Sequence, residues 1–154
     1  MTDAEQLSPK VAKKWLGDLG MNYYTCDHCA GIHLTGLDGL EEQQECRVFV
    51  EEWGLLFSTE FQVRPTMLLP LIASLGQLNG NYPTLKLFMD VVDDAVPQLV
   101  AGATQLTGAG LSQPQFDLFI ATCIEMSAGV FADLQDMGCL IENSDSGGGE
   151  HRLH

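Results

Sequence analysis

Two cysteines and a histidine in the first quarter of the chain are the residues best suited to chemistry. Cys26 and Cys29 form a C-x-x-C pair, His28 lies between them, and His33 follows the second cysteine by four residues. Thiolates and imidazoles are the ligands that Zn²⁺ prefers in tetrahedral sites. Cys26, Cys29 and His33 are therefore the candidate metal ligands, with His28 as a further candidate.

The residue pattern after Cys29 argues against a metal site. Apolar residues alternate with others from residue 29 to residue 35, which predicts an extended strand. Four residues of strand would separate the Cα atoms of Cys29 and His33 by about 13 Å, too far for two ligands of one ion. A single C-x-x-C pair also lacks the second pair that makes a structural zinc site specific. We therefore predict no metal ion and no other cofactor, and interpret the pair as the turn of a β-hairpin with reduced thiols.

A dithiol redox site is the alternative use of the same two cysteines. That chemistry is favoured when the first thiol lies at the N-terminus of a helix, where the helix dipole stabilises the thiolate. In this chain a predicted strand follows Cys29, so the pattern does not favour redox chemistry. The sequence also contains no G-x-S-x-G elbow and no glycine-rich loop that would hold a phosphate. We predict that the protein is not an enzyme.

The rest of the chain predicts an α+β domain. Ser8 and Gly20 bound the first predicted helix, and Ser112 and Gly138 bound the last. Between them the pattern predicts strands at residues 21–25, 30–35, 46–52 and 55–63, a helix at 66–78, and strands at 84–92 and 97–104. This α-β-β-β-β-α-β-β-α order implies a mainly antiparallel sheet of about six strands with three helices on one face. One face of the sheet should be buried and the other solvated.

Residues 8–139 are predicted to form a single domain. A chain of 154 residues is long enough to bury a core without disulfides or a metal. Cys123 and Cys139 lie at apolar positions and are predicted to be core residues. Residues 140–154, which are rich in glycine and charged residues, are predicted to be a flexible tail.

Composition excludes two classes of partner. The chain has 7 Lys and Arg against 21 Asp and Glu, for a net charge of -14, whereas nucleic acids are bound chiefly through clustered basic residues. We therefore predict no nucleic-acid partner. The longest apolar run, residues 67–75, is too short to span a bilayer, and the N-terminal segment lacks the apolar core of a secretory signal. We predict a cytoplasmic protein without a membrane partner.

An ordered set of short motifs resembles the bacterial YbjN family. The motifs are W-L-x-D-L-G-M at residues 15–21, C-D-x-C at 26–29 followed by H-L at 33–34, L-F-S at 56–58, V-R-P at 63–65, L-P-L at 69–71 and D-D-x-x-P-x-L-V at 93–100. The resemblance runs over residues 8–137. It implies a fold like that of type III secretion chaperones and a role in sensory transduction, with effects on motility, surface polysaccharide and stress. It implies no catalytic residue.

The sequence leaves three functions open. The preferred one is a non-enzymatic cytoplasmic regulator that binds another protein, of unknown identity, through its sheet or an apolar groove; the same surfaces would also suit a homodimer. The second is a small metal or thiol sensor that uses Cys26, Cys29 and His33. The third is a secretion chaperone that binds an unfolded client.

Overall fold

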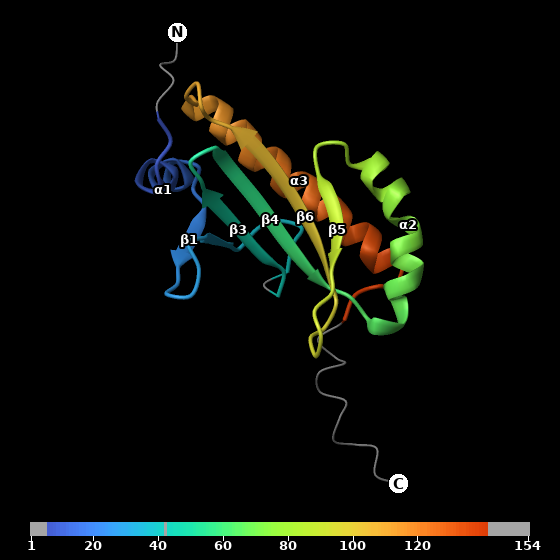
Figure 1. The fold of residues 1–154 in the computed structure, drawn as a ribbon. Helices are drawn as coiled ribbons and strands as arrows, with labels where there is room; N and C mark the ends of the chain where they lie inside the picture. Colours follow the sequence, from blue (N-terminus) through green and yellow to red (C-terminus); the bar gives the residue numbers. More distant parts are fainter. Residues whose placement is uncertain (1–5, 42, 142–154) are drawn as a thin grey trace.

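The computed structural model describes residues 6–41 and 43–141 and contains three α-helices and six strands within them (Figure 1). The elements are α1 (Pro9–Asp18), β1 (Asn22–Thr25), β2 (Ile32–Thr35), β3 (Glu45–Val50), β4 (Gly54–Gln62), the 3₁₀ helix η1 (Pro65–Met67), α2 (Leu68–Asn81), β5 (Lys86–Asp90), β6 (Gln98–Leu106) and α3 (Gln113–Asp136). This order confirms the predicted α+β class.

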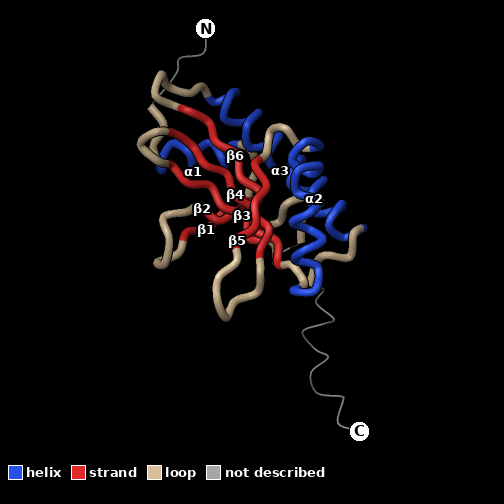
Figure 2. Tube along the Cα trace, turned by 45° about the vertical axis from the view of Figure 1, so that its right-hand side comes forward, coloured by secondary structure: helices blue, strands red, loops and turns tan. Residues whose placement is uncertain are grey.

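The six strands form one sheet in the order β1-β2-β3-β4-β6-β5, and every neighbouring pair is antiparallel. The sheet is a meander from β1 to β4, after which the chain crosses through α2 and returns so that β6 lies between β4 and β5. Helix α3 packs against β4 and β6, α1 packs against β3, and α2 packs against β5 (Figures 1 and 2). The β1–β2 hairpin and the β5 edge therefore lie at opposite ends of the sheet.

The face of the sheet that the helices cover forms the core. Phe57 and Phe61 alternate along β4 with more exposed polar residues, and both are fully buried. From the helix side Phe116 is also fully buried and meets the ring of Trp15 edge to face, with 5.3 Å between ring centroids. The opposite face carries partly exposed side chains such as Arg47 and Glu60. The structure thus has the one buried and one solvated face that the alternation predicts.

Polar caps set the ends of α1 and α3. The Ser8 hydroxyl accepts a hydrogen bond from the Val11 N–H at 3.2 Å, and Ser112 forms a capping box with Gln115. Beyond the last helical turns, Gly20 and Gly138 adopt φ values of 76° and 70°, which glycine reaches without a steric penalty. The predicted bounds of these two helices are therefore confirmed.

The ordered chain continues past residue 139, where the domain was predicted to end. Leu140 is buried and forms an antiparallel bridge with Val63, and the Ile141 N–H donates to the Gln62 carbonyl at 3.3 Å. The predicted tail therefore cannot begin at residue 140. The rest of that prediction, residues 142–154, lies outside the described residues.

Within residues 6–41 and 43–141, no helix has both the length and the apolar character needed to cross a lipid bilayer.

Candidate functional site

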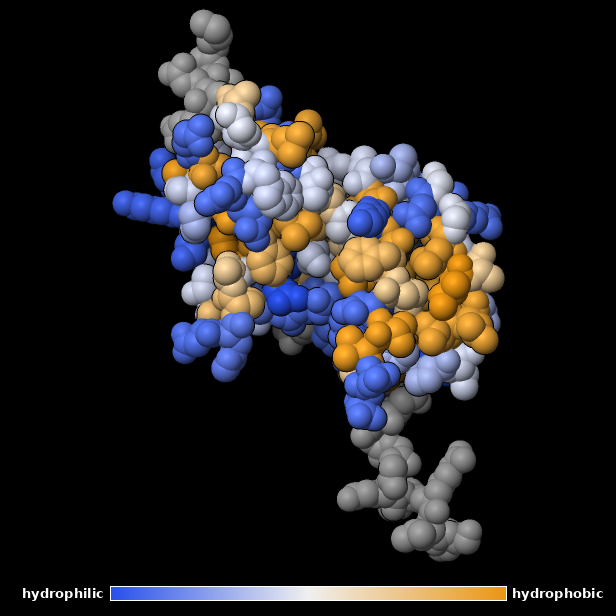
Figure 3. All heavy atoms as spheres, in the orientation of Figure 1, coloured by the Kyte–Doolittle hydropathy of each residue, from blue (hydrophilic) through white to orange (hydrophobic). Residues whose placement is uncertain are grey.

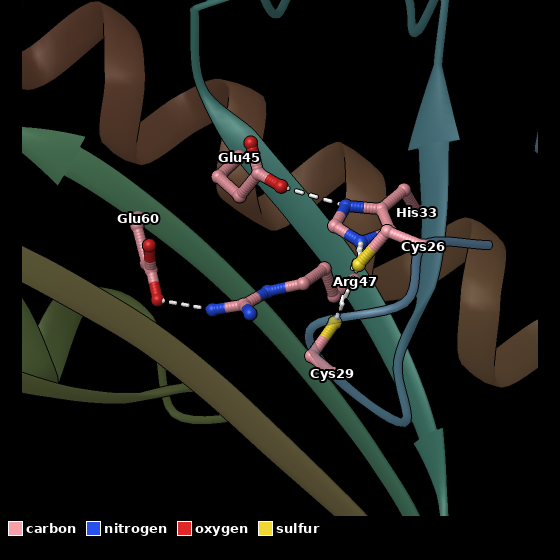
Figure 4. A network of polar contacts seen from close by, with 6 residues as sticks. All are labelled: Cys26, Cys29, His33, Glu45, Arg47 and Glu60. Carbon is pink, nitrogen blue, oxygen red and sulfur yellow. Dashed lines mark hydrogen bonds and ion pairs between the residues drawn. The ribbon is translucent and has the colours of Figure 1, made fainter. Parts of the chain in front are cut away.

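The β1–β2 loop brings Cys26, Cys29 and His33 together (Figure 4). The two sulfur atoms are 3.5 Å apart, and Nε2 of His33 lies 3.3 Å from Cys26 Sγ and 3.4 Å from Cys29 Sγ. The prediction of a strand from residue 29 is wrong, because β2 begins only at Ile32. The loop folds back before the strand starts, so Cys29 and His33 are in contact rather than about 13 Å apart.

Gly31 allows the loop to lie close against the solvated face of the sheet. A Cβ atom at this position would stand 2.9 Å from Cε1 of Phe49 and 3.4 Å from Cδ of Arg47, both on β3. Any larger residue would require either the Phe49 ring or the loop to move. The absence of a side chain at Gly31 therefore helps to place Cys29 over the sheet.

His33 is held in one orientation by two neighbours. Its Nδ1 lies 2.6 Å from Oε1 of Glu45, and its ring stacks on Tyr24 with centroids 4.5 Å apart and planes 9° apart. An ionised carboxylate can only accept, so Nδ1 carries the proton in this contact. In the neutral ring the lone pair on Nε2 then faces the two sulfur atoms. The histidine itself is 7% exposed, whereas the Glu45 side chain that holds it is 43% exposed and reaches the surface.

The surroundings of Cys29 favour its thiolate. The Gly31 N–H, followed by the Cys26 thiol, lowers the pKa of Cys29 to about 7, with smaller contributions from Arg47 and His33. The Arg47 guanidinium is in turn bound to Glu60 at 2.5 Å. Partial desolvation acts in the opposite direction but is outweighed. A large fraction of Cys29 is therefore thiolate at neutral pH.

The remaining cysteines lie elsewhere and differ in character. Cys46, Cys123 and Cys139 are buried among core residues, as predicted for the last two. Burial raises the pKa of both Cys46 and Cys123 to about 12. These thiols are suited to packing, and only Cys26 and Cys29 have the accessibility and neighbours that metal binding or thiol chemistry requires.

Sequence reasoning missed three residues of this site. Tyr24, Glu45 and Arg47 come from β1 and β3, and the strand register brings them beside His33, which pairs with Tyr24 on one side and Arg47 on the other. The sequence does contain a signal for two of them. Glu45 and Arg47 are two residues apart, so their side chains lie on the same face of a strand. The partner strand could not be read from that spacing.

Comparison with known proteins gives similarity over most of the chain. Residues 8–136 match the YbjN family, described as "Putative bacterial sensory transduction regulator". The "Uncharacterized protein YbjN" of Escherichia coli strain K12 is 30% identical over 135 residues, covering 88% of this chain and 85% of the relative, and the protein of that name from Shigella flexneri gives the same values. The "Crystal structure of YbjN, a putative transcription regulator from E. coli" matches with a TM-score of 0.82 and 28% identity, over 91% of this chain and 100% of that one.

Proposed function

The chain belongs to the YbjN family, and on this premise we propose that it is a non-enzymatic cytoplasmic regulator that binds another protein through an apolar surface on α2 and the β5–β6 loop. The processes that the family resemblance implies, namely motility, surface polysaccharide and stress responses, are part of the same proposal. Action as a secretion chaperone stays a prediction from the resemblance alone.

The observation that carries this proposal is a group of exposed aliphatic side chains, called here the apolar patch. Its members are between 41% and 76% exposed: Leu69, Ile72, Val91, Val92 and Val96. Figure 3 shows apolar side chains gathered over α2 and the neighbouring loop. The Val63 N–H donates to the Pro97 carbonyl at 2.9 Å, which ties the chain entering α2 to the end of that loop. Grouped exposure of this kind is typical of protein-binding surfaces.

Charge around the apolar patch favours a basic partner. Asp90, Asp93 and Asp94 are exposed beside its valines, and the Nε–H of Arg64, the basic residue that precedes η1, donates to the Leu140 carbonyl at 2.9 Å. A partner segment with apolar side chains flanked by Lys or Arg would match both features and would be attracted from a distance. A second copy of this chain would place like charges against each other, so we propose a different protein rather than a homodimer.

Strand β5 is the edge of the sheet next to the apolar patch, and its backbone at Leu87 is not open to an added strand. The Asn79 side chain on α2 donates to the Leu87 carbonyl at 3.0 Å and accepts from the Leu87 N–H at 2.9 Å. These bonds occupy the backbone groups that an added strand would use in the middle of β5. Side-chain contacts with the apolar patch are therefore the better-supported binding mode at this end of the molecule.

The test compares two exposed leucines on different helices. Leu69→Asp changes the apolar patch, whereas Leu118→Asp changes a side chain that is 70% exposed on α3, outside the patch. Each full-length variant is used to capture partners from a native lysate, and light scattering measures its oligomeric state. We expect Leu69→Asp to reduce recovery of a specific partner by at least about tenfold, a loss of ~1.4 kcal/mol in binding, with recovery by Leu118→Asp unchanged.

Two results would contradict the proposal. Equal recovery of every partner by the two variants would show that the apolar patch takes no part in binding. A native dimer that becomes monomeric only in Leu69→Asp would assign the patch to a second copy of the chain. Far-ultraviolet circular dichroism of both variants confirms that neither substitution has unfolded the domain.

A further inference from the structure

We propose that Cys26, Cys29 and His33 bind one Zn²⁺ ion, with Glu45 holding the imidazole in position. The site lies on the β1–β2 hairpin, at the opposite end of the sheet from the apolar patch. The inference therefore stands on different residues from the proposed function, and either can fail without the other.

The three ligand atoms already have nearly the spacing that a tetrahedral ion requires. With Zn–S bonds of about 2.3 Å and a Zn–N bond of about 2.0–2.1 Å, tetrahedral angles put two sulfurs about 3.8 Å apart and each sulfur about 3.6 Å from the nitrogen. The observed separations are 3.5 Å between the sulfurs and 3.3 and 3.4 Å from sulfur to nitrogen. Movements of a few tenths of an ångström in a loop would complete the geometry.

The contact between Glu45 and His33 is the arrangement found around metal-binding histidines. A carboxylate that accepts from Nδ1–H fixes the tautomer, orients the ring and makes Nε2 a stronger ligand. Nε2 of His33 points at both sulfurs, while Tyr24 stacks on the ring and prevents it from turning. The imidazole is thus oriented as a ligand by residues that do not themselves reach the ion.

The charges and the ligand number fit Zn²⁺. Two thiolates balance the charge of the ion. The nearby Arg47 guanidinium is paired with Glu60, and this carboxylate offsets the repulsion between the guanidinium and the ion. Within residues 6–41 and 43–141, no fourth Cys, His, Asp or Glu joins the cluster. The fourth coordination position would be taken by water, as in zinc sites with three protein ligands. Soft sulfur ligands favour Zn²⁺ over Mg²⁺ and Ca²⁺.

A disulfide between Cys26 and Cys29 is the competing use of these atoms. It would require the sulfurs to approach from 3.5 Å to about 2.05 Å and an oxidant to accept two electrons and two protons. In that bond neither sulfur would keep a proton or a negative charge, so Nε2 of His33, which faces both sulfurs, would lose both of its partners. The convergence of the imidazole on both sulfurs therefore favours the ion, and the two states are separable by experiment.

The experiment uses the full chain without an affinity tag, reduced and stripped of metal by a chelator. Zn²⁺ is titrated against a chromophoric chelator, and Co²⁺ is added separately to detect thiolate-to-metal charge transfer. We expect one Zn²⁺ per chain and charge-transfer absorption with Co²⁺. Cys26→Ser, Cys29→Ser and His33→Ala should each lose more affinity than the roughly 10–100-fold that outer-shell substitutions cost, and Glu45→Gln should lose about tenfold.

Matched controls test whether the effect belongs to these three residues. His28→Ala removes an exposed imidazole from the same loop, and Cys123→Ala removes a thiol from the core; both should leave Zn²⁺ affinity unchanged. In the unmodified chain, Zn²⁺ should slow alkylation of Cys26 and Cys29 by at least about tenfold. This last readout needs no variant, so it is unaffected by any folding defect that a substitution introduces.

Three outcomes would overturn the proposal. The first is a Zn²⁺ content far below one per chain in folded, reduced protein. The second is a loss of affinity in His28→Ala or Cys123→Ala as large as that in His33→Ala. The third is failure of Zn²⁺ to protect Cys26 and Cys29 from alkylation, together with rapid formation of a Cys26–Cys29 disulfide when a mild oxidant is supplied.

Discussion

The two faces of strand β3 create opposite environments for cysteine. On the helix-covered side, Cys46 is 2% exposed, and burial raises its pKa to about 12. On the solvated side, Cys29 lies over the strand near Arg47, and the Gly31 N–H does most to lower its pKa to about 7. The same functional group is therefore a protonated packing element on one face and a group that ionises near neutral pH on the other.

Two different physical effects shift the pKa values of Cys46 and Cys29. In the core, loss of hydration penalises the thiolate, and the Thr59 hydroxyl, which donates to Cys46 Sγ at 3.7 Å, offsets only part of that penalty. In the β1–β2 loop, hydrogen-bond donors outweigh partial desolvation. Alternation along β3 places Cys46 in the core, whereas the fold of the β1–β2 loop places Cys29 over the opposite face of the sheet.

Thiol alkylation should give the largest difference between the two environments. The pKa values of about 7 for Cys29 and about 12 for Cys46 differ by about five units, or about 10⁵ in thiolate fraction near pH 7. A low-pKa thiolate is intrinsically less nucleophilic, which reduces the expected rate ratio to a few hundred before steric protection is added. In metal-free protein, peptide mass spectrometry should therefore find Cys29 modified at least about a hundredfold faster than Cys46.

The pH dependence of that reaction has a definite sign. Because the reactive form is the thiolate, modification of Cys29 should accelerate as pH rises through about 7 and level off above it, while Cys46 stays unreactive in this range. Unfolding in urea should make the two rates similar. Equal rates in the folded protein would contradict the assignment of the two environments.

Serine substitutions at the two positions should have unequal effects on stability. Cys46→Ser places a hydroxyl in the core and should lower the free energy of unfolding by ~1–3 kcal/mol, towards the lower end because Thr59 can donate to the new oxygen. Cys26→Ser changes a partly exposed loop residue and should alter stability by no more than ~0.5 kcal/mol. Urea unfolding in the presence of a chelator measures both. Similar losses for the two variants would show that the loop is as tightly packed as the core.

The elements of the fold were predictable because their signals are local. Ser8 and Ser112 cap helices through bonds to residues three positions away, and Gly20 and Gly138 adopt the positive φ that ends a helix. Alternation along β4 likewise identified the buried face from residues such as Phe57 and Phe61. None of these inferences required knowledge of a distant contact.

The site was not predictable in the same way because it depends on contacts between strands. Alternation after Cys29 is compatible with a strand, but the contact of Gly31 with Phe49, eighteen positions later, accompanies a loop that turns back instead. The role of Glu45 depends on the register that places β3 beside β2. Residue types identified the candidate ligands, whereas only the tertiary structure could show that Cys29 and His33 meet.

A substitution at Gly31 tests the link between the loop and the low pKa of Cys29. In Gly31→Ala the new Cβ would contact the Phe49 ring at 2.9 Å, so either the ring or the loop must move, at a cost of ~1 kcal/mol in stability. Movement of the loop would weaken the hydrogen bond from the Gly31 N–H, the largest cause of the lowered pKa. The midpoint of Cys29 alkylation, meaning the pH at which its rate is half the maximum, should therefore rise towards the ordinary pKa of 9.0.

Gly17→Ala, in α1 with open space around its Cβ position, is the matched control and should leave the midpoint unchanged. An unchanged midpoint in Gly31→Ala would mean that Phe49 yields instead, and that the loop holds its conformation without the close approach.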